Sequence, residues 1–95
     1  MTNRMHKCLL HVDFLAGPND GHQGFARLKI ELPFCPTTDV ELEHPTWLDA
    51  CAPVRVSYNF ATHEFYVVMP TEEVGTIENV KLRKDIYSDN GWTVS

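Results

Sequence analysis

The chain has 95 residues and a formal net charge of −5, because 13 acidic side chains outnumber 8 basic ones. This length predicts a single domain over residues 1–95, and contents of 43% hydrophobic and 11% aromatic residues argue against disorder. Since Lys and Arg are outnumbered and scattered, no binding to nucleic acid, which needs basic groups against phosphates, is expected.

The chain also carries no predicted membrane segment. No stretch approaches the roughly 20 apolar residues that cross a bilayer. The apolar run at 8–10 is too short for a signal peptide, because His11 and Asp13 interrupt it. Three cysteines form an odd set, which favours reduced thiols and a cytoplasmic protein; one disulfide with one free thiol is the alternative.

Two long strands are predicted in the first third of the chain. Residues 6–15 alternate with apolar side chains on both faces, which is typical of a central strand. A dense turn signal follows at 17–21. Residues 25–34 then alternate between an apolar and a charged face, and Pro33 suits the end or the edge of a strand.

The middle of the chain predicts two short elements. Alternation over 39–44 indicates a strand with its acidic residues facing outward. Residues 45–52 indicate a helical turn, since Pro45 favours the first position of a helix. This turn is too short to be stable alone, so Trp47 and Leu48 are expected to anchor it to the sheet.

The strongest signal is a β-hairpin over 54–69, with a polar break near its centre. Its first strand has one apolar and one polar face. Its second strand is apolar on both faces, with Tyr66 and Val68 on the face opposite the one that Phe65 occupies. The second face must therefore be covered by the turn near residue 47, by the segment around residue 92, or by another molecule.

The C-terminal quarter is ambiguous. Residues 71–75 indicate a single turn or loop, because a glycine cuts off the start of a helix. Alternation favours a strand over 79–87, with a helix as the alternative. A turn at 89–91 precedes a last short strand at 92–94. The fold expected is all-β, a small antiparallel β-sandwich or barrel-like sheet of about six strands with at most one short helix; if 77–87 is helical, it is a compact α+β fold.

Histidine and cysteine residues are the first candidates for chemistry. His6 and Cys8 share one strand face, but two ligands do not make a zinc site and no C-x-x-C is present. His11 and Asp13 share the opposite face, where Cys8 cannot complete a nucleophilic set. No metal, no cofactor and no catalytic residue is therefore predicted.

Charge patterning indicates an interaction surface instead. Asp39, Glu41 and Glu43 form an acidic row along the predicted strand, and Lys81 and Arg83 share a face of the later one. The two rows are expected to pair within the chain, to pair between copies, or to face water.

These features favour a non-catalytic protein-interaction or self-associating domain, and specifically a homodimer. The predicted interaction residues are Asp39, Glu41, Glu43, Lys81, Arg83, Tyr66 and Val68. One alternative is a small metal-binding or Cys/His-dependent enzyme. The other is a binder of small apolar ligands, with a cavity lined by Trp47, Tyr58, Phe60 and Tyr66.

Overall fold

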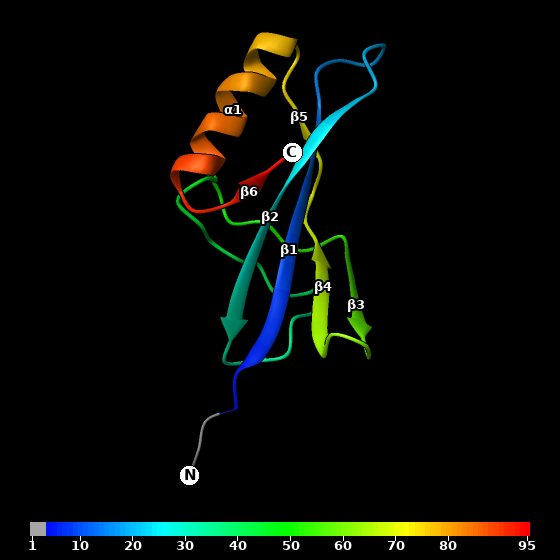
Figure 1. The fold of residues 1–95 in the computed structure, drawn as a ribbon, viewed down its shortest axis with the longest axis vertical. Coiled ribbons are helices and arrows are strands. Elements are labelled where there is room, and N and C mark those ends of the chain that lie inside the picture. The colour runs from blue at the N-terminus through cyan, green and yellow to red at the C-terminus, as the bar shows by residue number, and fades with distance from the viewer. Residues whose placement is uncertain (1–3) are drawn as a thin grey trace.

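The computed structural model of this protein describes residues 4–95. Its elements in chain order are β1 (His6–Leu15), β2 (His22–Leu32), β3 (Arg55–Asn59), β4 (Glu64–Val68), β5 (Glu72–Glu73), α1 (Ile77–Asp89) and β6 (Thr93–Val94). Figure 1 shows the long β1–β2 hairpin, with α1 beside one half of it and the β3–β4 hairpin beside the other half.

The strands form one six-stranded sheet in the order β3-β4-β1-β2-β6, with β5 paired to β1. The prediction of a β-rich domain of about six strands with one short helix is confirmed. The sheet is mixed rather than purely antiparallel, because β4 and β5 both run parallel to β1. Parallel pairing requires a crossover connection, and the segment between β2 and β3 provides it.

Strand β1 is the centre of the sheet, as its two apolar faces predict. One row of its side chains is fully buried and consists of Cys8, Leu10, Val12 and Phe14. Strand β2 pairs with it antiparallel, and β4 lies on its other side. Burial of this row against α1 and the loops supplies the main hydrophobic stabilisation.

The segment at 79–87 is helical, so the strand favoured there is wrong and the helical alternative is correct. Helix α1 begins at the N-cap Thr76, whose side chain accepts a hydrogen bond from the Asn79 N–H at 3.1 Å. It ends in a Schellman motif: the N–H of Trp92 reaches the Tyr87 carbonyl, and Gly91 takes a positive φ of 92°. These two caps outweigh the short alternation between them.

Helix α1 packs on the face of the sheet that carries the buried row of β1. Tyr87 is fully buried, and its ring lies edge-on to Phe14 at 5.3 Å between centroids. Trp92 packs on the other side of Tyr87 at 4.8 Å. We call this covered side the helix face and the opposite side the open face. No helix within residues 4–95 has the length and apolar character needed to cross a membrane.

The strand predicted at 39–44 and the helical turn predicted at 45–52 are both wrong. Residues 33–54 contain turns and bends, joined by one isolated bridge between Leu42 and Cys51. Trp47 does anchor this loop, since its ring N–H donates to the Tyr87 hydroxyl at 2.7 Å. Leu48 is fully exposed and anchors nothing.

The β3–β4 hairpin is confirmed, but its apolar row is not a buried face. Strand β4 lies between β3 and β1, so the backbone groups along both of its edges are paired. Strand β3 is at the edge of the sheet, and the predicted apolar row there leaves Val54 60% and Phe60 82% exposed. The edge position explains the exposure, because no further element packs beyond β3 within residues 4–95.

Candidate functional site

The outer edge of β2 is paired along the first half of the strand and unpaired along the second half. At its start it pairs with the C-terminal segment: the Phe25 N–H donates to the Ser95 carbonyl at 3.2 Å, and the Ser95 N–H donates back at 2.9 Å. Arg27 is the next residue of β2 in this ladder, opposite Thr93. Beyond Arg27, the part of the chain that the structure describes provides no further strand.

Lys29 and Glu31 continue the same outward-facing row of backbone groups. In an antiparallel ladder alternate residues point to alternate sides, so the N–H and C=O of these two residues point away from β1. Neither has a backbone partner on that side within residues 4–95. The segment 28–32 is therefore an open β-edge about 17 Å long at the usual strand rise.

Hollows lie beside this edge on both faces of the sheet. One of about 430 Å³ occupies the place where β6 stops, and it is lined by Leu9, Arg27, Leu28, Lys29, Gly91 and Thr93. One of about 460 Å³ lies on the helix face, where apolar side chains of β2 meet the loop around Trp47. Ile30 and Leu32 line it, with Glu41 and Glu43 among its polar residues.

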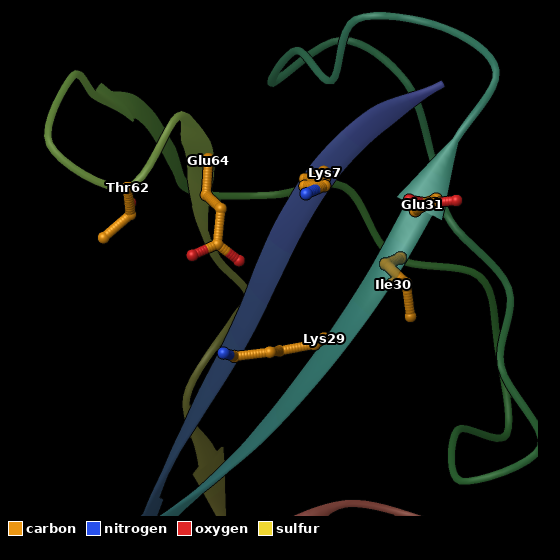
Figure 2. Close-up of a pocket in the computed structure, with 6 residues that line it drawn as sticks. All are labelled: Lys7, Lys29, Ile30, Glu31, Thr62 and Glu64. Carbon is orange, nitrogen blue, oxygen red and sulfur yellow. The ribbon is translucent and has the colours of Figure 1, made fainter. Parts of the chain in front are cut away.

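Charged residues of both signs mark the open face beside the edge (Figure 2). A hollow of about 480 Å³ there is lined by Lys7, Lys29, Glu31 and Glu64, together with Ile30 and Thr62. Figure 2 shows the Lys29 side chain extending from β2 across β1. Lys7 lies directly opposite Glu31 in the β1–β2 register, so the acidic group already has one basic neighbour.

The predicted pair of His11 and Asp13 is confirmed as a contact on the open face. The Nε2 of His11 donates to Asp13 Oδ1 at 2.9 Å, and the Nε2 of His22 donates to the same oxygen at 2.8 Å. Burial alone would raise the pKa of Asp13, but the hydrogen bonds from His22 and His11 lower it overall.

His11 is not free to act as a general base. Its Nδ1 accepts a hydrogen bond from Arg27 Nε at 3.1 Å, so that nitrogen carries no proton and the proton lies on Nε2. Both ring nitrogens are thus engaged, and the ring is buried beside Tyr66 at 5.7 Å. The arrangement joins β1 and β2 and leaves no lone pair for catalysis.

Tyr66 and Val68 lie on the open face, away from the two segments expected to cover them. Trp47 and Trp92 pack together on the helix face, where Tyr87 lies between α1 and the sheet. Tyr66 and Val68 instead line an open hollow of about 450 Å³ with His11, Asp13, Val54 and Arg55. Tyr66 and Val68 are therefore half-buried beside an open hollow and are not covered by either of those two segments.

His6 and Cys8 do not form a metal site. The Cys8 thiol is fully buried and donates to the His6 carbonyl at 3.4 Å. Burial, with smaller effects of Cys35 and Glu64, raises the pKa of Cys8 to about 11, which disfavours the thiolate that binds metals. No group of three or more His, Cys, Asp or Glu side chains in residues 4–95 is placed to hold an ion.

The two predicted charge rows do not meet each other. Asp39, Glu41 and Glu43 are exposed on the loop rather than on a strand. Lys81 and Arg83 are two residues apart on a helix, where such neighbours do not share a face. Lys81 is exposed, whereas the Arg83 guanidinium binds Glu72.

The four aromatic residues predicted to line a ligand cavity also lie apart. Trp47 is on the helix face and Tyr66 on the open face. The rings of Tyr58 and Phe60 lie edge to face, with 5.1 Å between their centroids, at the exposed end of the β3–β4 hairpin. They do not line one common cavity.

No protein-family model, curated protein or solved structure matches this chain. The geometry of the open β2 edge is therefore the basis for a function. Sequence reasoning placed Lys29 and Glu31 on a water-facing side but did not identify them as a site. The one signal available was Pro33, which marks where the edge ends.

Proposed function

We propose that this protein is a non-catalytic protein-interaction domain that binds its partner by strand addition along the open edge of β2. The proposal rests on the outward-pointing N–H and C=O groups of Lys29 and Glu31, which have no backbone partner within residues 4–95. An extended segment laid along an exposed sheet edge gains main-chain hydrogen bonds, and its alternate side chains enter neighbouring pockets.

The surroundings of the edge support an occupant of defined chemistry. On the helix face, Leu28, Ile30 and Leu32 are half-buried and form an apolar row. On the open face, Lys29 and Glu31 present opposite charges. The fitting partner is an extended protein segment with alternating apolar side chains and with acidic and basic groups on its other face.

A protein partner agrees better with the charge of the chain than nucleic acid does. The net charge is −5, and the acidic Glu31 and Glu64 lie beside the basic groups of the open face. The three free thiols, Cys8, Cys35 and Cys51, support a reducing compartment such as the cytoplasm. Cys8 is buried, and both ring nitrogens of His11 are engaged in hydrogen bonds. These two observations support a binding role over an enzymatic one.

Amide hydrogen exchange on the ¹⁵N-labelled full chain tests strand addition. The probe is a synthetic peptide with the sequence of residues 25–34, which carries the required alternation. We expect the exchange of the Lys29 and Glu31 amides to slow by at least about tenfold with peptide, or with rising protein concentration. A scrambled peptide of the same composition is the control. Unchanged exchange of both amides at millimolar peptide and at millimolar protein would overturn the proposal.

A further inference from the structure

The identity of the added strand follows from the order of charges along the β2 edge. We infer that the occupant is the same edge of a second copy of this chain, paired antiparallel about a twofold axis at Ile30. The inference rests on the proposed strand addition and names its partner. It yields a symmetric dimer in which the two sheets continue into one another.

This arrangement uses the unpartnered backbone groups completely. With Ile30 opposite the partner's Ile30, Lys29 lies opposite the partner's Glu31. Because the N–H and C=O of Lys29 and Glu31 both point outward, each such pair exchanges both backbone hydrogen bonds. Ile30 itself bonds inward to β1, opposite Cys8, and needs nothing from the second copy.

The side-chain charges match in this register. In this register Lys29 lies directly across from the partner's Glu31 on the open face, where its side chain, which extends over β1 in the single chain, turns outward to reach the carboxylate. The twofold axis repeats the same pair on the other side. Opposite charges directly across an antiparallel pair are favourable, and like charges are unfavourable. Glu31 then lies between Lys7 of its own chain and the partner's Lys29.

The neighbouring registers fail for identifiable reasons. Centring the pair on Glu31 places two glutamates opposite each other and sets Lys29 against the partner's Pro33, which has no N–H. Centring it on Lys29 places two lysines opposite each other and sets Glu31 against the partner's Arg27, whose outer groups already pair with β6. The register at Ile30 is the one in which both backbone and charge are satisfied.

The apolar row agrees with the same register. On the helix face, Leu28 lies opposite the partner's Leu32, and Ile30 lies opposite its own copy. These side chains are half-buried in the single chain, so pairing removes more of their apolar surface from water. The edge strand β3 has Arg55 as its single charged residue, and the short edge strand β5 consists of two glutamates, so neither offers a self-complementary pair.

Charge-swap variants test both the partner and the register. The molecular mass of the full chain is measured by sedimentation equilibrium from micromolar to millimolar concentration. We expect wild type to dimerise, and Lys29→Glu or Glu31→Lys alone to raise the dissociation constant by at least about tenfold, because like charges then face each other. An equimolar mixture of the two variants is expected to form a heterodimer. The double variant Lys29→Glu/Glu31→Lys is expected to recover the homodimer.

The mixture keeps the test decisive even if one replacement lowers stability, since heterodimer formation requires two folded chains. Lys81→Glu makes the same charge change on the exposed side of α1 and is expected to leave the dissociation constant within about twofold. A dimer that Tyr58→Pro on β3, whose N–H points away from β4, abolishes and Lys29→Glu leaves intact would overturn the inference. So would single variants that dimerise like wild type, or a mixture that stays monomeric.

The experiments distinguish a failure of self-association from a failure of strand addition. A wild-type chain that stays monomeric at millimolar concentration overturns the inference. If the residue 25–34 peptide still protects the Lys29 and Glu31 amides in that monomer, strand addition stands and the partner is a different protein. If neither peptide nor concentration protects these amides, both proposals are wrong.

Discussion

Arg83 on α1 holds both carboxylate oxygens of Glu72 on β5. Its Nε lies 2.7 Å from Oε1 and its Nη2 lies 2.9 Å from Oε2, while Nη2 also donates to the Thr46 carbonyl at 2.7 Å. The Tyr87 hydroxyl donates to the same carboxylate and accepts from Trp47. The side-chain hydrogen bond to Glu72 raises the pKa of Arg83, and burial opposes this effect. One bidentate ion pair thus joins the helix, the short strand and the loop over the helix face.

Replacing Arg83 by Met is expected to lower the free energy of unfolding by about 1–3 kcal/mol. The two side chains are 25% and 21% exposed, so the pair is partly shielded from water. The variant retains much of the apolar stem but leaves Glu72 without its cation and the Thr46 carbonyl without its donor. Urea denaturation followed by circular dichroism measures the difference.

Lys81→Met is the matched control for this variant. Lys81 is on the same helix but is exposed, so its replacement is expected to change the free energy of unfolding by less than about 0.5 kcal/mol. Equal losses for Lys81→Met and Arg83→Met would show that the ion pair contributes nothing beyond general effects on α1.

Short-range patterns in the sequence were enough to predict most of the strands. Alternation identified β1, β2 and the β3–β4 hairpin, because side-chain direction in a strand depends only on neighbouring residues. Helix α1 was misread since Val80, Leu82 and Ile86 also alternate, although Leu82 and Ile86 are exposed in the helix. The caps at Thr76 and Gly91 were the better signal.

The candidate site could not be predicted because it depends on strand order. The parallel return of β4 fills one side of β1, and the shortness of β6 leaves the edge open at Lys29 and Glu31. Neither fact is local in the sequence. The same limit applies to Arg83, whose partner Glu72 was expected to lie in a loop.

Gly24 permits the close approach of the C-terminal segment to β2. Its φ is +118°, and a Cβ there would lie 2.2 Å from the Ser95 carbonyl oxygen. Gly24→Ala is therefore expected to cost more than about 2 kcal/mol and to displace β6, because it combines backbone strain with a clash against main chain. Urea denaturation measures the cost, and exchange of the Phe25 and Ser95 amides reports on β6.

Gly21→Ala separates these two effects. Gly21 has a φ of +66° but nothing within 4 Å of the methyl group that alanine would add, so only the left-handed conformation opposes the replacement. We expect a loss of about 1 kcal/mol without loss of β6. If Gly24→Ala were no more destabilising than Gly21→Ala, the contact with Ser95 would not constrain the edge.

Cys8 is expected to resist modification in the folded protein. The reactive species is the thiolate, and with a pKa of about 11 only about a thousandth of this thiol is ionised at pH 8. Cys8 is also fully buried, whereas Cys35 is exposed. Iodoacetamide at pH 8, followed by peptide mass spectrometry, should modify Cys35 at least about 100-fold faster than Cys8. In concentrated urea the two rates should converge. Equal rates in the native protein would contradict this prediction and would make Cys8 a candidate nucleophile.

The stability of the fold is expected to depend on the protonation of His44. Its Nδ1 accepts hydrogen bonds from the Thr46 hydroxyl at 2.8 Å and from the Thr46 N–H at 3.2 Å, so the folded state requires this nitrogen to be unprotonated. Burial lowers the pKa of His44 below its usual 6.5. As the pH falls through 6.5, the unfolded chain therefore takes up a proton that the folded chain does not. The free energy of unfolding should decrease from about pH 7 towards pH 5 and stay level above pH 7.

His44→Asn isolates this effect from the other four histidines. The Asn side-chain oxygen takes the position of Nδ1 and accepts from the Thr46 N–H, but it does not titrate. Urea denaturation between pH 5 and 8 is expected to give a shallower pH dependence for this variant than for wild type. His63→Asn is the control, because the exposed His63 has a φ of +57° that Asn tolerates and has no hydrogen-bond partner within residues 4–95. If His63→Asn flattened the curve as much as His44→Asn, the Thr46 contacts would not be the cause.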